Sequence, residues 1–591
     1  MLLAAGVIGF VVFIGQVNVT KAKVLYVVDI GYETPDVTLG QKLAVLACQG
    51  LINRGDGAVF TIKESWDKLW LETALEADTE LEPQTLSIDG FLVEVCETLK
   101  FPAIIYSKDA HHELIPEIIT IAGVLDAVPL DTDSGLDKLP SWSEHPVVFD
   151  VFSQFLNFTE LEATEYIFDH FANQTTGVGM MNPGWKQPDA LHPAQHDLVR
   201  DPDVGLADFI IKEKIFNFFL YQGCVPLTIE HNLMKRMMTD AGTSWIKPVE
   251  VYGYNDAVNI LGGSFFEAET TCIEEHNMGQ VASSGQNNFS FFNKRAAISS
   301  PKDLEKYMDA LKKTRQEIAD GSLVFDPSMT YMTFILGDGD NVAFMKGSRR
   351  GWMKERLDSC KESDTCSYPL VWSMSPHLLY MGPTMLEWYY SQANLTGQDV
   401  FALPPSGHLY AYPGMMVGTN KENFVRRTQQ DCDLLMATGS VHWEWFYGWQ
   451  QAFDRYFPEY SKQPNSTLSC VRSFFGTDVP YNLPTNVIWT DKFKMLEGDV
   501  FVFKPREWRG TNKEGIPIFA EHNYLTEEEM ADEINGYTKG TVSHLYLTSD
   551  GGMNLSILYK MISLLEDHVK IVNHEELTEM ARQKSSILPN M

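Results

Sequence analysis

Two aspartates on either side of one glycine, Asp338 and Asp340, are the residues in this sequence best suited to acid–base catalysis. Two neighbouring carboxylates resist simultaneous ionisation, so one pKa rises and that group can serve as a general acid. Glycoside hydrolysis commonly needs one such acid and a second carboxyl group. The intervening glycine allows varied geometry, so we expect both side chains to reach the site. The alternative is an acidic turn that only caps the following helix.

Two glutamates are further catalytic candidates. Glu444 lies between Trp443 and Trp445, where an apolar aromatic setting would raise its pKa and the indole rings could stack on a sugar. The alternative is a strand end whose tryptophans belong to the core. Glu521, in Glu521-His522-Asn523, is the fourth predicted catalytic residue. The predicted substrate-binding residues are Asn341, Ser406, His408, Tyr410, Tyr412, Trp443, Trp445 and Asp550.

The strand that must position the aspartates is predicted over residues 330–336. This run lacks polar alternation, which is typical of a strand covered on both faces in a parallel sheet. Ligands bind at the carboxyl ends of such strands. Further strands are predicted at 370–373, 400–403, 433–437, 487–490, 500–503, 516–520 and 543–547, with helices between most of them. The candidate residues follow these strands, as do Lys504, Arg506 and Glu507 after the sixth.

This alternation of strands and helices predicts an α/β fold whose C-terminal domain is a (β/α) barrel-like unit. Roughly eight βα units over about 250 residues is the size of such a barrel. The unit after 500–503 has no clear helix, so the barrel could be irregular or seven-stranded. Smaller α/β modules precede it, and none has a Gly-rich phosphate loop. The predicted ranges are 1–22 for a signal peptide or anchor, 23–98, 99–175 and 176–325 for the modules, and 326–585 for the barrel.

Composition limits the classes of partner. The 46 basic and 79 acidic residues give a net charge of -33, which repels nucleic acid and anionic lipid. A neutral glycan is easier to accommodate, and the 13 tryptophans and 23 tyrosines suit stacking on sugar rings. Trp185 is the candidate contact from the N-terminal modules to the catalytic face.

The N-terminus predicts entry into the secretory pathway. Residues 1–14 are apolar or glycine, a run too short to span a membrane comfortably but suited to a signal peptide, with a signal anchor as the alternative. We therefore expect a secreted or lumenal protein without a stable membrane span. The glycosylation sequons are Asn18, Asn157, Asn173, Asn288, Asn394, Asn465 and Asn554. Of the eight cysteines, Cys360 and Cys366 could close a short disulfide loop, and several others could be buried thiols.

A stretch after the third predicted strand carries a family resemblance. Ser406-Gly407-His408-Leu409-Tyr410-Ala411-Tyr412-Pro413 resembles the signature of the GxGYxYP putative glycoside hydrolases, except that Leu409 stands at the second Gly. Gly337–Asn341, Trp372–Pro376 and Gln49–Arg54 resemble other motifs of that family. The resemblance spans residues from about 24 to 580. It implies small N-terminal α/β modules before a barrel-like catalytic domain that acts on carbohydrate.

Two other functions remain open. His377, His442 and His522, with Asp338 and Asp340, provide the residue types of an Asp/His metal site, and therefore of a metal-dependent carbohydrate deacetylase. A secreted glycan-binding protein without turnover is the third possibility. For the glycosidase we assign no metal ligand and expect no cofactor. The sequence contains no GxSxG motif and no zinc-ligand spacing.

Overall fold

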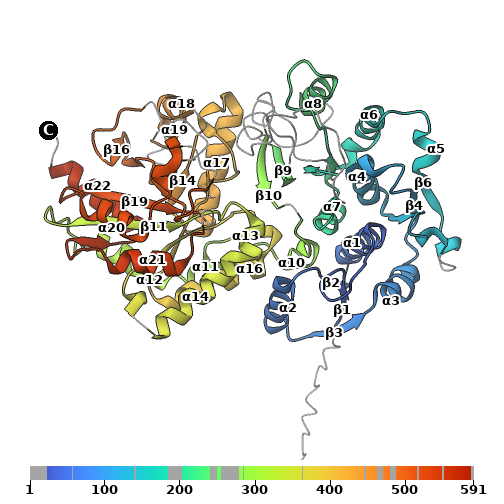
Figure 1. Cartoon of the computed structure of the whole chain (residues 1–591), viewed down its shortest axis with the longest axis horizontal. Coiled ribbons are helices and arrows are strands. Elements are labelled where there is room, and N and C mark those ends of the chain that lie inside the picture. The colour runs from blue at the N-terminus through green and yellow to red at the C-terminus, as the bar shows by residue number, and fades with distance from the viewer. Residues whose placement is uncertain are drawn as a thin grey trace, which may run out of the picture.

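The computed structural model describes residues 23–55, 57–138, 142–183, 202–239, 249–254, 278–283, 285–362, 364–444, 448–461, 470–478, 487–514, 518–548 and 552–587. Helices alternate with mostly parallel strands, which confirms the predicted α/β class. The N-terminal modules and the C-terminal part lie on opposite sides of the molecule, with strands β9 and β10 between them (Figure 1). Within the described ranges, no helix has the length and apolar character needed to cross a membrane.

Each N-terminal range contains one parallel sheet. The first has the order β2-β1-β3: Ala58–Ile62, Lys23–Asp29 and Leu81–Leu86. The second has the order β5-β4-β6: Val128–Asp131, Ala103–Tyr106 and Val147–Asp150. The third has the order β10-β9-β7-β8: Met278–Ala282, Val249–Tyr254, Val178–Met181 and Phe216–Phe218.

Of the α-helices described in these modules, α1 is almost wholly buried and packs against α4, α7 and α10. These α-helices are α1 (Leu39–Arg54), α2 (Ser65–Ala77), α3 (Ile88–Gly90), α4 (Ile115–Leu125), α5 (Val151–Phe155), α6 (Glu160–Phe171), α7 (Ala207–Glu213), α8 (Ile229–Thr239), α10 (Phe289–Phe292), α11 (Lys302–Glu305) and α12 (Asp309–Ala319). Gln49 and Asn53 of α1 both donate to the backbone oxygen of Val59 and reach Asn288 and Ser290. The helix motif in Gln49–Arg54 therefore connects the first module to the third.

The C-terminal part contains two sheets. The first has the order β13-β12-β11-β19-β18, with β20 also paired to β11. The second has the order β14-β15-β17-β16, in which only the β16–β17 pair is antiparallel. The strands are β11 (Thr330–Leu336), β12 (Val371–Ser373), β13 (Val400–Ala402), β14 (Gly439–His442), β15 (Ser473–Gly476), β16 (Phe493–Leu496), β17 (Val500–Phe503), β18 (Glu507–Trp508), β19 (Val542–Leu547) and β20 (Val569–Ile571).

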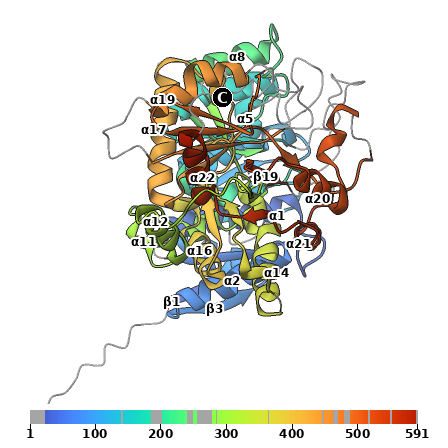
Figure 2. The same ribbon diagram turned by 90° about the vertical axis from the view of Figure 1, so that its left-hand side faces the viewer.

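Helices lie around these strands on several sides (Figure 2). They are α13 (Val342–Lys346), α14 (Ser348–Glu362), α15 (Leu378–Met381), α16 (Pro383–Thr396), α17 (Gly418–Leu435), α18 (Gly448–Gln451), α19 (Phe457–Ser461), α20 (Glu527–Asn535), α21 (Leu555–Ser563) and α22 (His574–Ile587). Every residue of β11 is buried, as expected for a strand covered on both faces.

Backbone hydrogen bonds join the two sheets at two places. The N–H of Leu403 donates to Gly439 at 2.8 Å, and that of Val441 donates to Leu403 at 2.9 Å. Beyond β17, the N–H of Arg506 donates to Gly476 at 3.3 Å, and that of Tyr546 donates to Arg506 at 3.1 Å. The described strands of the C-terminal part are assigned to two sheets and not to one closed barrel, so the barrel itself stays a prediction.

Three predicted strands are wrong. Residues 433–437 mostly continue α17, which ends at the left-handed Met436, and the strand begins only at Gly439. Residues 487–490 are irregular, and the strand of this region is β16. The described part of 516–520 belongs to the 3₁₀ helix η10 (Ile518–Asn523). Short apolar runs do not separate strand from helix by periodicity, which explains these errors.

The cysteines are paired more extensively than predicted. The expected Cys360–Cys366 disulfide is confirmed, and Cys48–Cys96 and Cys432–Cys470 are also bonded instead of being buried thiols. One sequon is unsuited to glycosylation, because Asn288 is fully buried and donates to the backbone oxygen of Thr61 and to Asp67. Asn157 and Asn173 are exposed, whereas Asn18 and Asn465 lie outside the described residues.

Candidate active site

The turn after β11 is held closely between its neighbours. Asp338 has a φ of 59°, a left-handed conformation that aspartate tolerates better than most residues. A Cβ on Gly337 would collide with the Tyr546 ring, and one on Gly339 would collide with the backbone of Ser373. The Gly339 N–H donates to Ser373 Oγ at 3.0 Å. The glycines therefore permit close packing against β19 and β12, and the varied geometry expected from the sequence is not what they provide.

Asp338 forms an ion pair at this turn. Arg349 Nη2 lies 2.8 Å from Asp338 Oδ2, and Arg349 Nε donates to the Gly337 oxygen at 2.8 Å. Arg349 is buried, and its guanidinium lies 3.9 Å from the centre of the Trp352 ring. The side chain of Asp338 keeps 21% of its surface exposed, so it is fixed in place and still reachable.

Asp340 is half-buried at the end of the same turn. Burial raises its pKa to about 8, the charge of Asp338 acts in the same direction, and Arg349 opposes both. A carboxyl group with this pKa is mostly protonated at neutral pH and can donate its proton. The turn thus brings an ion-paired carboxylate and a protonated carboxyl group together.

A third carboxyl group, Glu507 of β18, joins this pair. Glu507 is fully buried, and burial raises its pKa to about 8, with Arg509 opposing and Asp478 and Asp338 adding to the rise. Thr477 Oγ1 donates to Glu507 at 3.1 Å, and Arg509 Nε lies 2.9 Å from it. The predicted site omitted Glu507, although its position after the strand at 500–503, between two arginines, was visible in the sequence.

Tyr546 is close enough to all three carboxyl groups to be affected by their charges. It lies on β19, its hydroxyl accepts a hydrogen bond from the Asp338 N–H at 2.9 Å, and it is nearly fully buried. Burial raises its pKa strongly, and the charges of Asp338, Asp340 and Glu507 raise it further. The carboxyl ends of β11, β18 and β19 therefore supply one cluster of titratable groups.

The signature loop after β13 is buried and does not form an open platform. The rings of Tyr410 and Tyr412 pack on Trp443 with centroids 4.2 Å and 4.9 Å away. Tyr410 also exchanges two backbone hydrogen bonds of 3.0 Å with Gln280 of β10. Ser406 is fully buried and donates to the Trp443 oxygen at 3.3 Å. These residues join the third N-terminal sheet to the C-terminal part.

Leu409, the departure from the family signature, has a specific neighbour. A Cβ placed on Gly279 of β10 would lie 2.9 Å from both Cβ and Cδ1 of Leu409. Leu409 is buried, so its side chain occupies the space that the missing side chain of Gly279 leaves open. The leucine is accommodated at an interface between modules.

His408 is an electrostatic link between modules. Its Nδ1 lies 2.7 Å from Asp431 of α17, and its Nε2 lies 3.4 Å from Glu250 of β9. Burial lowers its pKa, but Asp431 and Glu250 outweigh burial and raise the pKa to about 9. His408 is therefore mostly charged at neutral pH and pairs with acids on both sides.

The other predicted catalytic glutamates lie in different surroundings. Glu444 is buried, accepts from the Gly414 N–H at 2.6 Å and lies 3.0 Å from His442 Nε2. A Cβ on Gly448 would collide with it, so it is tightly enclosed. Burial raises its pKa. Glu521 lies half-buried in η10 and does not follow a parallel strand, contrary to the prediction.

Of the remaining predicted site residues, Asn341 is a helix cap and the others lie outside the described residues. Asn341 caps α13 by accepting from the Ala343 N–H at 2.9 Å. Trp445, Asp550 and Trp185 lie outside the described residues. Within the described ranges, no group of three or more His, Cys, Asp and Glu residues is placed to hold a metal ion. The deacetylase alternative gains no support from that part of the chain, and the absence of a cofactor stays a prediction.

Comparisons with known proteins agree with this fold. Along 95% of both chains, the protein is similar to the crystal structure of a putative hydrolase from Bacteroides thetaiotaomicron VPI-5482, with a TM-score of 0.67 and 16% sequence identity. At this identity the likeness shows the fold alone. A comparison with curated proteins found no match. Residues 328–582 match the model of the GxGYxYP putative glycoside hydrolase C-terminal domain, which confirms the family resemblance for that part of the chain.

Proposed function

We propose that this protein is a glycoside hydrolase in which Asp340 is the general acid and Asp338 the carboxylate that balances charge at the sugar. The observation that carries the proposal is the placement of both carboxyl groups in one turn at the carboxyl end of β11, with Asp338 paired to Arg349 and Asp340 half-buried. The raised pKa of Asp340, about 8, agrees with its role as the acid. The family matched by residues 328–582 supports a carbohydrate substrate. Both aspartates are partly accessible, whereas Glu507 is fully buried.

The proposed reaction needs only these groups and water. The proton of Asp340 passes to the glycosidic oxygen, which keeps the electron pair of its bond to the anomeric carbon as that bond breaks. Asp338 stabilises the positive charge that develops on the sugar. Water then supplies a hydroxyl group to the anomeric carbon, and its remaining proton restores the protonated carboxyl of Asp340. Arg349 positions the Asp338 carboxylate, and the buried Tyr546 hydroxyl accepts from the Asp338 N–H.

We also propose that the two C-terminal sheets work as one barrel-like unit. The bridge between Leu403 and Ser440 and the bonds of Arg506 to Gly476 and Tyr546 support this. In such a unit the parallel strands present their carboxyl ends on one face, where active sites of (β/α) barrels lie. The disulfides and the apolar N-terminus support a secreted or lumenal location.

A glycan panel tests the proposal. Purified protein is incubated with neutral and acidic glycans, with and without a chelator, beside Asp338→Asn and Asp340→Asn. We expect release of reducing sugar that survives chelation and falls at least about 100-fold in either variant. Folding of the variants is checked by thermal melting. Release of acetate that stops in chelator would instead support the deacetylase, and binding without any product would support the glycan-binding protein.

A further inference from the structure

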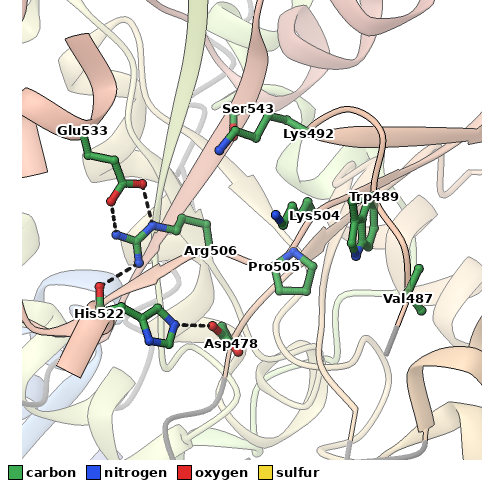
Figure 3. Close-up of a pocket in the computed structure, with 10 residues that line it drawn as sticks. All are labelled: Asp478, Val487, Trp489, Lys492, Lys504, Pro505, Arg506, His522, Glu533 and Ser543. Atoms are coloured by element: carbon green, nitrogen blue, oxygen red, sulfur yellow. Dashed lines mark hydrogen bonds and ion pairs between the residues drawn. The ribbon is translucent and has the colours of Figure 1, made fainter. Parts of the chain in front are cut away.

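A cavity of about 460 Å³ lies beside the carboxyl cluster, between β19, α20 and the chain that flanks β17. Its lining residues are Asp478, Val487, Trp489, Lys492, Lys504, Pro505, Arg506, His522, Glu533 and Ser543 (Figure 3). A second hollow of about 640 Å³ shares Trp489, Lys492 and Lys504 with it. The two hollows therefore adjoin and form one extended site.

The charge around these hollows is opposite to that of the chain. The chain carries 46 basic and 79 acidic residues. The two linings contain five lysine or arginine residues, Lys492, Lys504, Arg506, Lys539 and Lys584, and three acids, Asp478, Asp491 and Glu533. A local excess of positive charge in a strongly acidic protein would raise the concentration of anions there.

The acids in the wall are already paired. Arg506 binds Glu533 through two contacts of 2.9 Å and 2.5 Å, and His522 Nε2 lies 2.7 Å from Asp478. Lys584 lies 2.6 Å from Asp491. The charges of Lys492 and Lys504 are left to act on a ligand, with Lys492 placed 4.0 Å from the centre of the Tyr537 ring. Burial lowers the pKa of Lys492, the charges of Glu533 and Asp491 oppose burial, and the nearby cations Lys504 and Arg506 add to the lowering.

Trp489 supplies an aromatic surface that lines both hollows and is half-buried. An indole beside ammonium groups suits a sugar ring that bears an anionic substituent, since the ring stacks while the lysines bind the charge. The first hollow borders the carboxyl cluster, because Arg506 of its wall precedes Glu507, and Asp478 of its wall acts on the pKa of Glu507. The second hollow extends away from that cluster, since Phe325 and Thr541 of its wall precede β11 and β19.

We propose that this extended site binds an acidic sugar unit, bearing a carboxylate or a sulfate, of the saccharide that the protein recognises. The net charge of -33 favours a neutral glycan, but the substrate meets the local charge of the site and not the average over the surface. The link of this site to catalysis rests on the proposed function, whereas binding of the acidic sugar can be tested without any turnover.

Calorimetric titration of Asp340→Asn protein separates the two proposals, because binding is measured without turnover. The probes are a uronic-acid oligosaccharide, a sulfated oligosaccharide and a neutral oligosaccharide of the same length. We expect one acidic probe to bind at least tenfold more tightly than the neutral one, with the advantage shrinking as salt rises from 0.05 to about 0.5 M. The acidic probe that binds more tightly shows whether the site prefers a carboxylate or a sulfate.

Matched variants locate the binding. Lys492→Met and Lys504→Met keep a long unbranched side chain and remove its charge. Each should lower the affinity for the acidic probe about tenfold without changing the affinity for the neutral probe. Lys354→Met, an exposed lysine on α14, is the control and should change neither. Equal affinity for all three probes, or no loss in the lysine variants, would overturn the site. Tight acidic binding by a wild-type protein that hydrolyses no glycan would overturn the proposed hydrolase and leave the binding site standing.

Discussion

Asp338 and Asp340 share one turn at the end of β11, and burial together with the charge of Asp338 raises the pKa of Asp340 to about 8. Arg349, 2.8 Å from Asp338, binds this carboxylate and also limits the rise at Asp340. One arginine thus controls both acids. The turn meets the two requirements of acid-assisted glycoside cleavage, a held proton and a fixed negative charge.

The pH profile should report the proton on Asp340. Because its pKa is raised to about 8, the protonated fraction is nearly complete below pH 7 and falls tenfold per unit above pH 8. We expect kcat/KM to fall along an alkaline limb centred near pH 8, and Arg349→Met to move that limb to higher pH. A profile that stays level to pH 10 would contradict the assignment of Asp340 as the acid.

Glu444 should prove structural. Glu444→Ala would leave the Gly414 N–H and His442 without their carboxylate partner, and we expect it to lower the free energy of unfolding by about 1–3 kcal/mol. Glu444→Gln keeps the accepting oxygen and should retain most of the activity. Chemical denaturation and initial rates check both. A glutamine variant of native stability that loses more than about 100-fold in kcat would restore the catalytic role expected from the sequence.

Leu409 and Gly279 should be energetically coupled. Gly279→Ala places a methyl group 2.9 Å from Leu409, and we expect a loss of about 1–3 kcal/mol in stability. Leu409→Gly restores the glycine of the family signature and removes the clash. The double variant should therefore be more stable than the sum of the single effects by at least about 1 kcal/mol. Additive effects in denaturant titrations would mean that these residues do not share one space.

Glu117 offers a stability test remote from the carboxyl cluster. It is nearly fully buried on α4, and burial raises its pKa from 4.5 to about 8. As pH rises above 4.5, the unfolded chain releases this proton first, so the folded state loses stability between pH 4.5 and 8. Glu117→Gln should be about 1–3 kcal/mol more stable than wild type at pH 8 and show no such gain at pH 4.

The control for Glu117 is the half-buried Glu113, four residues earlier in the chain. Because Glu113 is only half-buried, Glu113→Gln should not reproduce the gain in stability at pH 8. If Glu117→Gln gives no gain at pH 8, water reaches the side chain and burial does not hold it protonated.

The elements with strong patterns could be predicted from the sequence. The strands at 330–336 and 500–503 were predicted with their observed bounds, and those at 400–403 and 543–547 differ from the structure by one residue at one end. The start of α1 also has a local cause, because Thr38 and Gln41 form a capping box there. The strand β15 was missed because its sequence, SFFG, has only two residues that favour strands, whereas the equally short β17 is VFVF.

The site was harder to predict, because its members are set by distant contacts. The turn at Asp338 and Asp340 was visible as a local pattern. Glu507 follows a predicted strand, but its place in the cluster depends on the pairing of β18 with β19, which sets it beside Tyr546. Tyr410 and Tyr412 alternate as a sugar-binding pair would, but β10, more than a hundred residues earlier, pairs with that loop and buries it.

The most direct test of the general acid compares Asp340→Asn on two substrates of one sugar, identified with the glycan panel. The alkoxide of an alkyl glycoside needs a proton to leave, whereas the dinitrophenolate of a dinitrophenyl glycoside leaves without one. We predict that kcat/KM falls at least about 100-fold for the alkyl glycoside and less than about tenfold for the dinitrophenyl glycoside. A variant that folds and hydrolyses both at the wild-type rate would contradict the account and reduce the turn to a helix cap.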